Sequence, residues 1–385
     1  MAKRSPIAPP SASAGGTHSG AVFRRKTNRA IKARWTRLRD AKTVLTMAAL
    51  AIGLVVAGLW SISVGQFGVS SGQSLRSFWH ILTGLGSASE LDVVLWEVRL
   101  PRVVLAAIVG AGLALAGVAL QAIFGNPLAE PGLIGVSSGA AVGASLAVVL
   151  GAGGIAGASV ASSAFLTNWA IAGTAFAGGI IATVIVGLSA KGNRDIARVI
   201  LVGVAVNAVA GGLVSFLTYI ASTSARDRIV FWQMGSFASA DWSNVIITLL
   251  LTLPAFLLLW FYSTKLDILS LGEAQARHLG VNVVALRRTV IGITALVVAA
   301  GVAFSGIIVF IGLVVPHALR LILGPQHRVL IPACFLGGAL ATTLADLAAR
   351  TLINGADLPL GMLTSIIGGP IFFWLLIRSE RAVKR

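Results

Sequence analysis

The sequence predicts an all-α protein that crosses a membrane about ten times. The first observation is composition, since 56% of the 385 residues are hydrophobic and only 11% are charged. An average soluble domain has roughly 25% charged residues, so this chain has too few to cover a water-facing surface. The second observation is the length of the charge-free runs, because about 20 apolar residues span a bilayer. Residues 131–190 contain no charged residue and have room for two spans. A transmembrane β-barrel would show short alternating strands instead.

Ten spans fit along the chain. We place them at residues 44–64, 100–124, 131–151, 169–190, 196–220, 243–263, 286–305, 307–323, 329–350 and 359–377. With the N-terminus in the cytoplasm, 24 of the 30 Lys and Arg residues lie in cytoplasmic segments. Basic residues favour the cytoplasmic side of a membrane protein, so both termini are expected there.

Three parts are expected. Residues 1–43 are predicted to be a disordered, basic cytoplasmic tail, because residues 5–20 are rich in Pro, Ser, Gly and Ala. Residues 44–378 form the transmembrane domain, and residues 379–385 form a short cytoplasmic C-terminus. The net charge of +17 is concentrated before the first span. This distribution indicates a topology anchor in contact with anionic membrane lipid, and no nucleic-acid partner is expected.

The chain lacks the motifs of common catalytic sites. Its single cysteine, Cys334, excludes a multi-cysteine metal site. There is no G-x-x-x-x-G-K-[ST] phosphate loop and no H-E-x-x-H metal motif. We therefore expect no catalytic residue, no metal site and no cofactor, and any ATP hydrolysis must occur in another subunit.

Helix breakers interrupt the apolar sequence at "NPLAEPG", residues 126–132. Asn126-Pro127 is expected to end one helix, because the residue before proline disfavours the helical conformation. Pro131 and Gly132 then restart the chain near the membrane surface. Broken backbone is tolerated there only where protein or water satisfies its polar groups.

Five blocks of sequence, in order, resemble a known family. They are "RLPRVVLAAIVGAGLALAGVALQAIFGNPLAEPGLIGVSSGA" (99–140), "FWQMGSFASADW" (231–242), "LSLGEAQARHLGV" (269–281), "IVFIGLVVPHALR" (308–320) and "LPLGMLTSIIGGPIFFWLL" (358–376). They look like the permease subunit of bacterial ABC importers for iron-siderophores, heme and vitamin B12, the FecCD-like, BtuC-like family. The resemblance covers about residues 44–378, and the first 40 residues depart from the pattern.

The resemblance implies a type II ABC importer permease fold in the bacterial plasma (inner) membrane. It also implies a homodimer, two cytoplasmic ATPase subunits, an extracytoplasmic substrate-binding protein and an iron-chelate ligand, either heme or a ferric siderophore. A cobalamin permease is the alternative. An ion-coupled secondary transporter is less favoured, because only Glu130 and Asp346 offer carboxylates and both lie near span ends.

The family pattern also implies three sets of site residues. A short helix that docks on the ATPase comprises Leu271, Gly272, Glu273, Ala274, Arg277, Leu279 and Gly280; a solvated loop helix with a Glu273–Arg277 pair is the simpler reading. Arg99, Arg102 and Arg350 resemble residues that dock the binding protein, whereas interfacial anchoring or a local Asp346–Arg350 pair would also explain them. Asn126 and Leu128 are expected at a cytoplasmic gate, with a plain tight turn as the alternative.

Overall fold

The computed structural model describes residues 18–64, 71–84, 89–151, 164–189, 196–353 and 355–383, and the regular structure in these ranges is helical. The chain divides into two compact units, Met1–Thr46 and Met47–Arg385. The first helix, α1 (His18–Ser63), begins within the segment that we expected to be disordered. Its basic part is rich in Lys, Arg and Ala, which favour helix and so extend the helix of the first span toward the N-terminus. The following description concerns the second unit.

Each predicted span coincides with an apolar helix, which confirms the all-α membrane fold. Seven helical stretches in the described ranges have the length and apolar character needed to cross a membrane. They coincide with all or part of α1, α4 (Leu100–Phe124), α6 (Ala164–Ser189), α7 (Ile196–Ile220), α9 (Trp242–Phe261), α12 (Val283–Ser305) and α14 (His327–Thr351). Three predicted spans form helices with shorter apolar stretches, α5 (Val136–Gly151), α13 (Ile311–Leu323) and α15 (Leu360–Val383).

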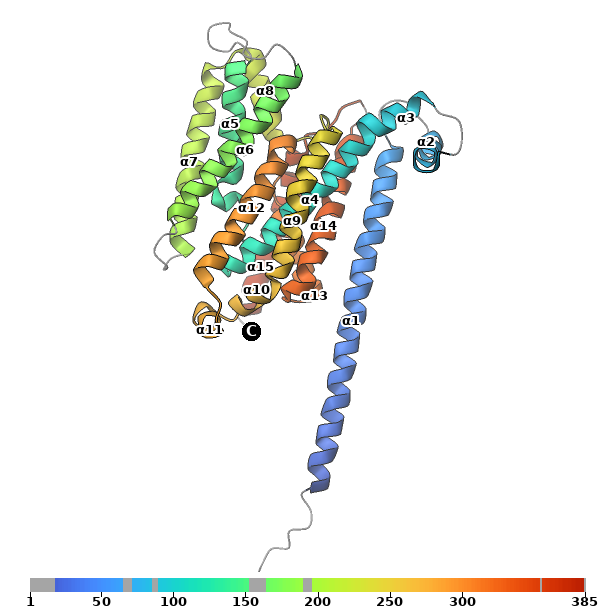
Figure 1. Ribbon diagram of the computed structural model, residues 1–385, viewed down its shortest axis with the longest axis vertical. Helices are drawn as coiled ribbons and strands as arrows, with labels where there is room; N and C mark the ends of the chain where they lie inside the picture. The colour runs from blue at the N-terminus through green and yellow to red at the C-terminus, as the bar shows by residue number, and fades with distance from the viewer. Residues whose placement is uncertain are drawn as a thin grey trace, which may run out of the picture. The chain divides into compact units, whose positions relative to one another are not determined.

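Helix α4 lies at the centre of the bundle and contacts α9, α12, α13 and α14 (Figure 1). Small residues allow this close packing, because they let helix backbones approach one another. A methyl group on Gly117 would overlap the backbone of Gly312 in α13, and one on Gly110 would overlap the carbonyl oxygen of Gly338 in α14. The glycines of α4 therefore set how near its two neighbours lie.

The chain between α12 and α13 is irregular, and α13 begins at Ile311 instead of residue 307 as predicted. The backbone turns at Gly306 (φ 68°) and again at Phe310 (φ 67°), a left-handed conformation that bulky residues rarely adopt. Neighbouring chain segments satisfy the freed backbone groups. Ser236 N–H donates to the Ser305 carbonyl, at the end of α12, at 2.7 Å.

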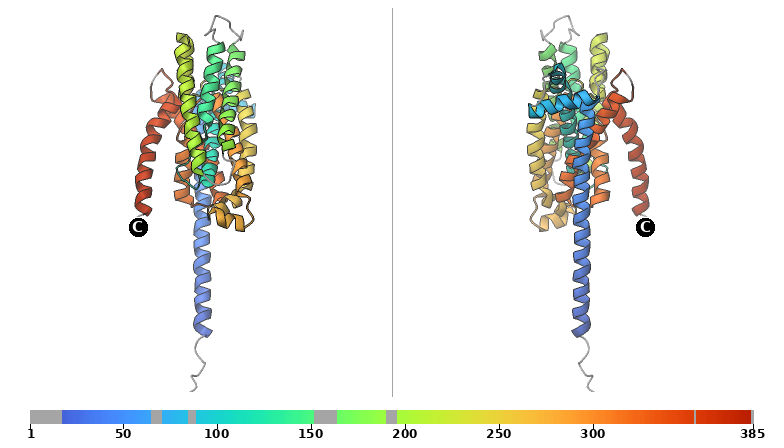
Figure 2. Two further views of the ribbon diagram at one scale, coloured as in Figure 1. Left: turned by 90° about the vertical axis from the view of Figure 1, so that its left-hand side faces the viewer. Right: turned by 90° about the vertical axis from the view of Figure 1, so that its right-hand side faces the viewer.

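Short helices lie at both ends of the bundle (Figure 1). At one end, which we call the α3 end, are α2 (Ser71–Thr83), α3 (Glu90–Val94) and the π-helix η1 (Leu95–Arg99), which leads into α4. Helix α8 (Thr223–Met234) also lies toward this end. The opposite end, the α11 end, carries α10 (Ser263–Leu269) and α11 (Glu273–His278), as the two side views in Figure 2 also show. A 3-10 turn, η2 (Pro131–Ile134), precedes α5.

Candidate functional sites at the two ends of the bundle

The charged segment at the α11 end forms the short helix that the sequence predicted. Helix α11 is bounded by glycines in conformations that other residues avoid, Gly272 (φ 112°) and Gly280 (φ 82°). Ala276 is buried and anchors the helix, whereas Leu271 and Leu279 are exposed on either side of it. Glu273 and Arg277 form the expected i, i+4 ion pair at 3.3 Å. Ala274 lies in the first turn, and the seven predicted docking residues all lie in α11 or within two residues of its ends.

Glu273 also connects this segment to the centre of the bundle. Its second carboxylate oxygen accepts a hydrogen bond of 2.5 Å from Nη2 of Arg287, in the first turns of α12. The same guanidinium donates through Nε to the carbonyl of Ile123 at 3.2 Å, in the last turn of α4. A cationic side chain near a helix C-terminus can donate to the last carbonyls, which have no partner within the helix. One arginine therefore links α11, α12 and the end of α4.

The turn that follows α4 holds the two predicted gate residues. Gly125 ends the helix with φ 59°, and Asn126 Oδ1 accepts a hydrogen bond from Leu128 N–H at 2.9 Å. The Asn126 carbonyl accepts another from Ala129 N–H at 3.1 Å. An asparagine that bonds its own backbone two residues onward is a common turn former. The Asn126 side chain therefore stabilises the turn and sets the position of Leu128, which is half-buried.

Polar side chains from other helices support this broken region. Asn207 of α7 donates to the Gly132 carbonyl at 3.1 Å, so the backbone of η2 is satisfied by protein. Glu130 precedes η2, and burial raises the pKa of its carboxyl group. The turn is thus held on both sides, by Arg287 through α4 and by Asn207 through η2.

Helix α14 begins at the α11 end with a second acidic contact. A single carboxylate oxygen of Asp267 in α10 bonds the backbone N–H of His327 at 2.8 Å and its ring Nδ1 at 2.7 Å. Burial opposes ionisation of Asp267, but the hydrogen bonds from His327 prevail and lower its pKa. The carboxylate also satisfies a free N–H at the start of α14, as an N-cap side chain would.

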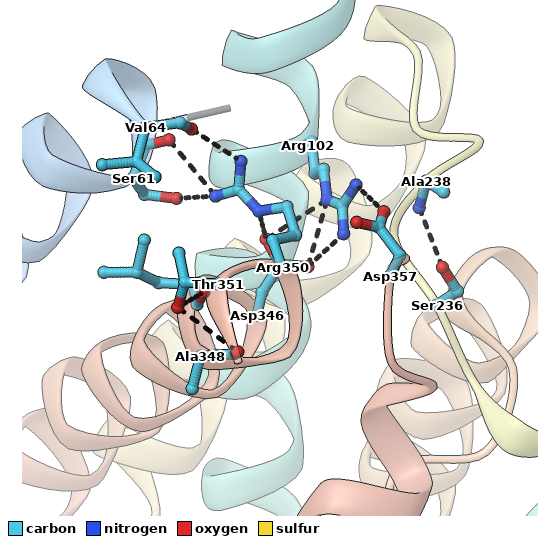
Figure 3. Close-up of polar contacts among 11 residues, drawn as sticks. Ser61, Val64, Arg102, Ser236, Ala238, Asp346, Ala348, Arg350, Thr351 and Asp357 are labelled. Carbon is cyan, nitrogen blue, oxygen red and sulfur yellow. Dashed lines mark hydrogen bonds and ion pairs between the residues drawn. The ribbon is translucent and has the colours of Figure 1, made fainter. Parts of the chain in front are cut away.

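At the α3 end, two of the predicted arginines share one buried aspartate (Figure 3). Arg102 of α4 donates from Nε and Nη2 to Asp346 of α14, at 3.0 to 3.2 Å. Arg350 forms an ion pair with the same carboxylate at 3.1 Å, the i, i+4 pair expected from the sequence. Asp346 is only 2% exposed, whereas Asp357, which accepts from Nη1 of Arg102 at 2.7 Å, is 31% exposed. We call these four residues the outer charge cluster.

Arg99 and Arg350 also hold the end of α1. Arg350 donates to the carbonyls of Ser61 and Val64 and to the Ser61 hydroxyl, and Arg99 donates to the Ile62 carbonyl at 2.8 Å. The last carbonyls of a helix lack partners within it, and a cation there also opposes the negative end of the helix dipole. Arg99 is 5% exposed and donates to the Ile62 carbonyl and to the Ser74 hydroxyl. The three arginines are therefore largely buried and already hydrogen-bonded within the chain.

Sequence reasoning did not place Arg102 beside Asp346 or Arg287 beside Glu273. The first pair is separated by 244 positions and the second by 14, so neither follows from helical spacing. The Asp346–Arg350 and Glu273–Arg277 pairs were predicted because both are four residues apart on one helix. In the described ranges, no cluster of three His, Cys, Asp or Glu side chains is arranged to hold a metal ion.

The fold and these sites define a multi-pass membrane permease, and comparison with known proteins identifies its family. The model of the FecCD transport family matches residues 53–378, so the chain belongs to that family. The chain is 39% identical over 338 residues to the hemin transport system permease protein HmuU of Yersinia pestis, an alignment covering 87% of this chain and 96% of the relative. It is 37% identical over 347 residues to the vitamin B12 import system permease protein BtuC of Salmonella paratyphi A, an alignment covering 90% of this chain and 99% of the relative.

A solved structure gives the same result. It is described as an inward-facing conformation of a metal-chelate type ABC transporter, and it superposes on this chain with a TM-score of 0.74 at 34% identity. The match covers 86% of this chain and 98% of the solved one. The predicted fold and family are therefore confirmed, and the role of the chain is transport.

Proposed function

We propose that this chain is the pore-forming subunit of an ATP-driven importer that brings an iron chelate, heme or a ferric siderophore, into the bacterial cytoplasm. The observation that carries the proposal is the connection Glu273–Arg287–Ile123, which leads from the exposed helix α11 to the turn at Asn126. A permease driven by a separate ATPase needs such a contact between its docking surface and its gate. The hemin relative supports an iron chelate, and the vitamin B12 relative keeps cobalamin as the alternative.

In the proposed orientation, the protein lies in the bacterial inner membrane. The α11 end and both termini face the cytoplasm. The excess of Lys and Arg in the loops on that side supports this orientation. In a homodimer, helix α11 of each permease would then face one of two cytoplasmic ATPase subunits. Leu271 and Leu279 are exposed beside it and offer apolar contacts for docking. Leu128 and the turn set by Asn126 would form the cytoplasmic gate.

The α3 end would then receive the extracytoplasmic binding protein. Arg102 and Arg350 are mostly engaged inside the chain, and Asp357 is the most exposed member of the outer charge cluster. A carboxylate of the partner would therefore replace Asp357 as the acceptor of the hydrogen bond from Nη1 of Arg102. Arg99 would act indirectly in docking, because it fixes the end of α1 next to this cluster. Charges at the rim of an interface mainly steer association and fix its register.

Uptake in reconstituted vesicles tests the proposed function. Vesicles that contain the permease, its ATPase subunits and external binding protein are expected to accumulate heme or a ferric siderophore when ATP is present inside. Cobalamin serves as the competing substrate. Vesicles without the ATPase are the control and should take up none of the three. Uptake that persists in that control, particularly with an imposed proton gradient, would favour an ion-coupled transporter and contradict the proposal.

The link through Arg287 gives a sharper prediction. Arg287→Gln removes the charge that joins Glu273 to the Ile123 carbonyl, so ATP hydrolysis should continue while uptake falls several-fold. The neighbouring Arg288→Gln is the matched control, because Arg288 is exposed on the same turn of α12. Both activities are measured on the same vesicles. Equal uptake by the two variants would show that the Arg287 contact does not transmit the ATPase cycle.

A further inference from the structure

Helix α2 has an apolar face that the protein leaves uncovered. Leu75, Trp79 and Leu82 are 53%, 60% and 63% exposed, and their spacing of four and three residues places them along one line of the helix. We call these three residues the apolar stripe of α2. Arg76 is also exposed but lies about 100° around the helix from Leu75, given 3.6 residues per turn.

The rest of α2 is fastened to the bundle. Phe78 and Ile81 pack against a small core of Ile62, Leu95 and Val103, from α1, η1 and α4. Ser74 is buried and accepts a hydrogen bond from Nη1 of Arg99 at 2.9 Å.

A second attachment joins α2 to α3. Nδ1 of His80 pairs with Asp92 at 2.8 Å, and the hydroxyls of Ser77 and Ser89 lie 3.2 Å apart. The helix is thus held on one side by packing and by polar contacts, and its apolar stripe is fixed in direction.

The orientation of α2 differs from that of the spans. Figure 1 shows α2 nearly end-on while the bundle helices run along the page, and Figure 2 shows it lying across them. It lies next to the end of α1, a membrane-spanning helix whose Val56 and Trp60 are also exposed. A lipid-facing helix end beside an amphipathic helix that runs across it places that second helix at the level of the lipid head groups.

We propose that the apolar stripe of α2 is a membrane-surface contact that inserts into the lipid head-group region at the α3 end. Leu75, Trp79 and Leu82 enter the boundary between head groups and acyl chains, while Arg76 stays among the head groups and water. Tryptophan is enriched at that depth because its ring is amphipathic. The contact holds α2, and with it the attachment site of Arg99 on Ser74, at a fixed height relative to the bilayer.

Site-specific labels test this proposal without reference to transport. Cys334 is the single cysteine and is buried, so Cys334→Ala provides a background free of reactive thiol. Leu75→Cys and Arg76→Cys are then labelled with an environment-sensitive fluorophore in phospholipid nanodiscs. The Leu75 label should be quenched by brominated lipid and shielded several-fold from aqueous iodide. The Arg76 label, one residue away, should show the reverse.

The outcomes separate lipid from other occupants. Equal access of iodide to both labels would overturn the proposal. Shielding of the Leu75 label only after addition of the purified binding protein would assign the stripe to that protein and would also overturn it. Leu82→Cys repeats the test on the next turn, so a single variant that fails to fold does not decide the result.

Discussion

Replacing Asp346 by alanine is expected to lower the free energy of unfolding by about 3–5 kcal/mol, because it leaves two largely buried arginines without their shared carboxylate. The loss exceeds that of a surface ion pair, which contributes about 0–1 kcal/mol, since Asp346 is 2% exposed. Arg102 would retain Asp357 alone, and Arg350 would retain only neutral acceptors on α1. Thermal or denaturant unfolding of the purified permease measures the effect.

Two variants separate charge from shape in this test. Asp346→Asn keeps the size of the side chain but not its charge, so it should lose most of the same stability. Glu90→Ala removes an exposed acidic residue from the same end of the bundle and should change stability little. Near wild-type stability of Asp346→Asn would mean that packing, and not the buried charge, accounts for the role of Asp346.

The second large effect is expected at Gly117. A methyl group there would overlap the backbone of Gly312, and a backbone cannot move aside as a flexible side chain does. Gly117→Ala should therefore separate α4 from α13 and destabilise the protein by about 1–3 kcal/mol, the usual range for overpacking. The same unfolding measurement applies, with the yield of folded permease in membranes as a second readout.

Gly292→Ala is the matched control for Gly117→Ala. Gly292 lies within α12 and has open space where a methyl group would be placed. Alanine favours helix over glycine by about 0.5–1 kcal/mol, so this variant should be as stable as the parent protein or slightly more stable. A Gly117→Ala protein that unfolds like Gly292→Ala would contradict the close α4–α13 contact.

The sequence predicted the spans well because a charge-free run of about 20 residues has few other uses than crossing a bilayer. It predicted the turn at Asn126 and the ends of α11 for a local reason, since proline and glycine restrict or permit particular backbone conformations. It missed the late start of α13, because the left-handed conformation of Phe310 depends on its surroundings and not on its own preference.

In the candidate sites, too, the sequence predicted local features and missed contacts that depend on tertiary packing. Pairs within one helix, such as Asp346 and Arg350, followed from spacing, whereas Arg102 is brought to Asp346 only by the packing of α4 on α14. Helix α2 was also missed, because Arg76 and several polar residues keep it from resembling a span. Its spacing of Leu75, Trp79 and Leu82 is a signal that could have revealed an amphipathic helix.

Helix α14 is held at both ends by ion pairs and hydrogen bonds to carboxylates, so it acts as a rigid spacer. Asp267 holds its first residue, His327, and the outer charge cluster holds Asp346 and Arg350, roughly 29 to 35 Å further along the helix. A helix fixed at both ends keeps the distance between the two faces of the protein constant along its length. A movement of one face relative to the other during transport would therefore have to carry α14 along or break one of these two contacts.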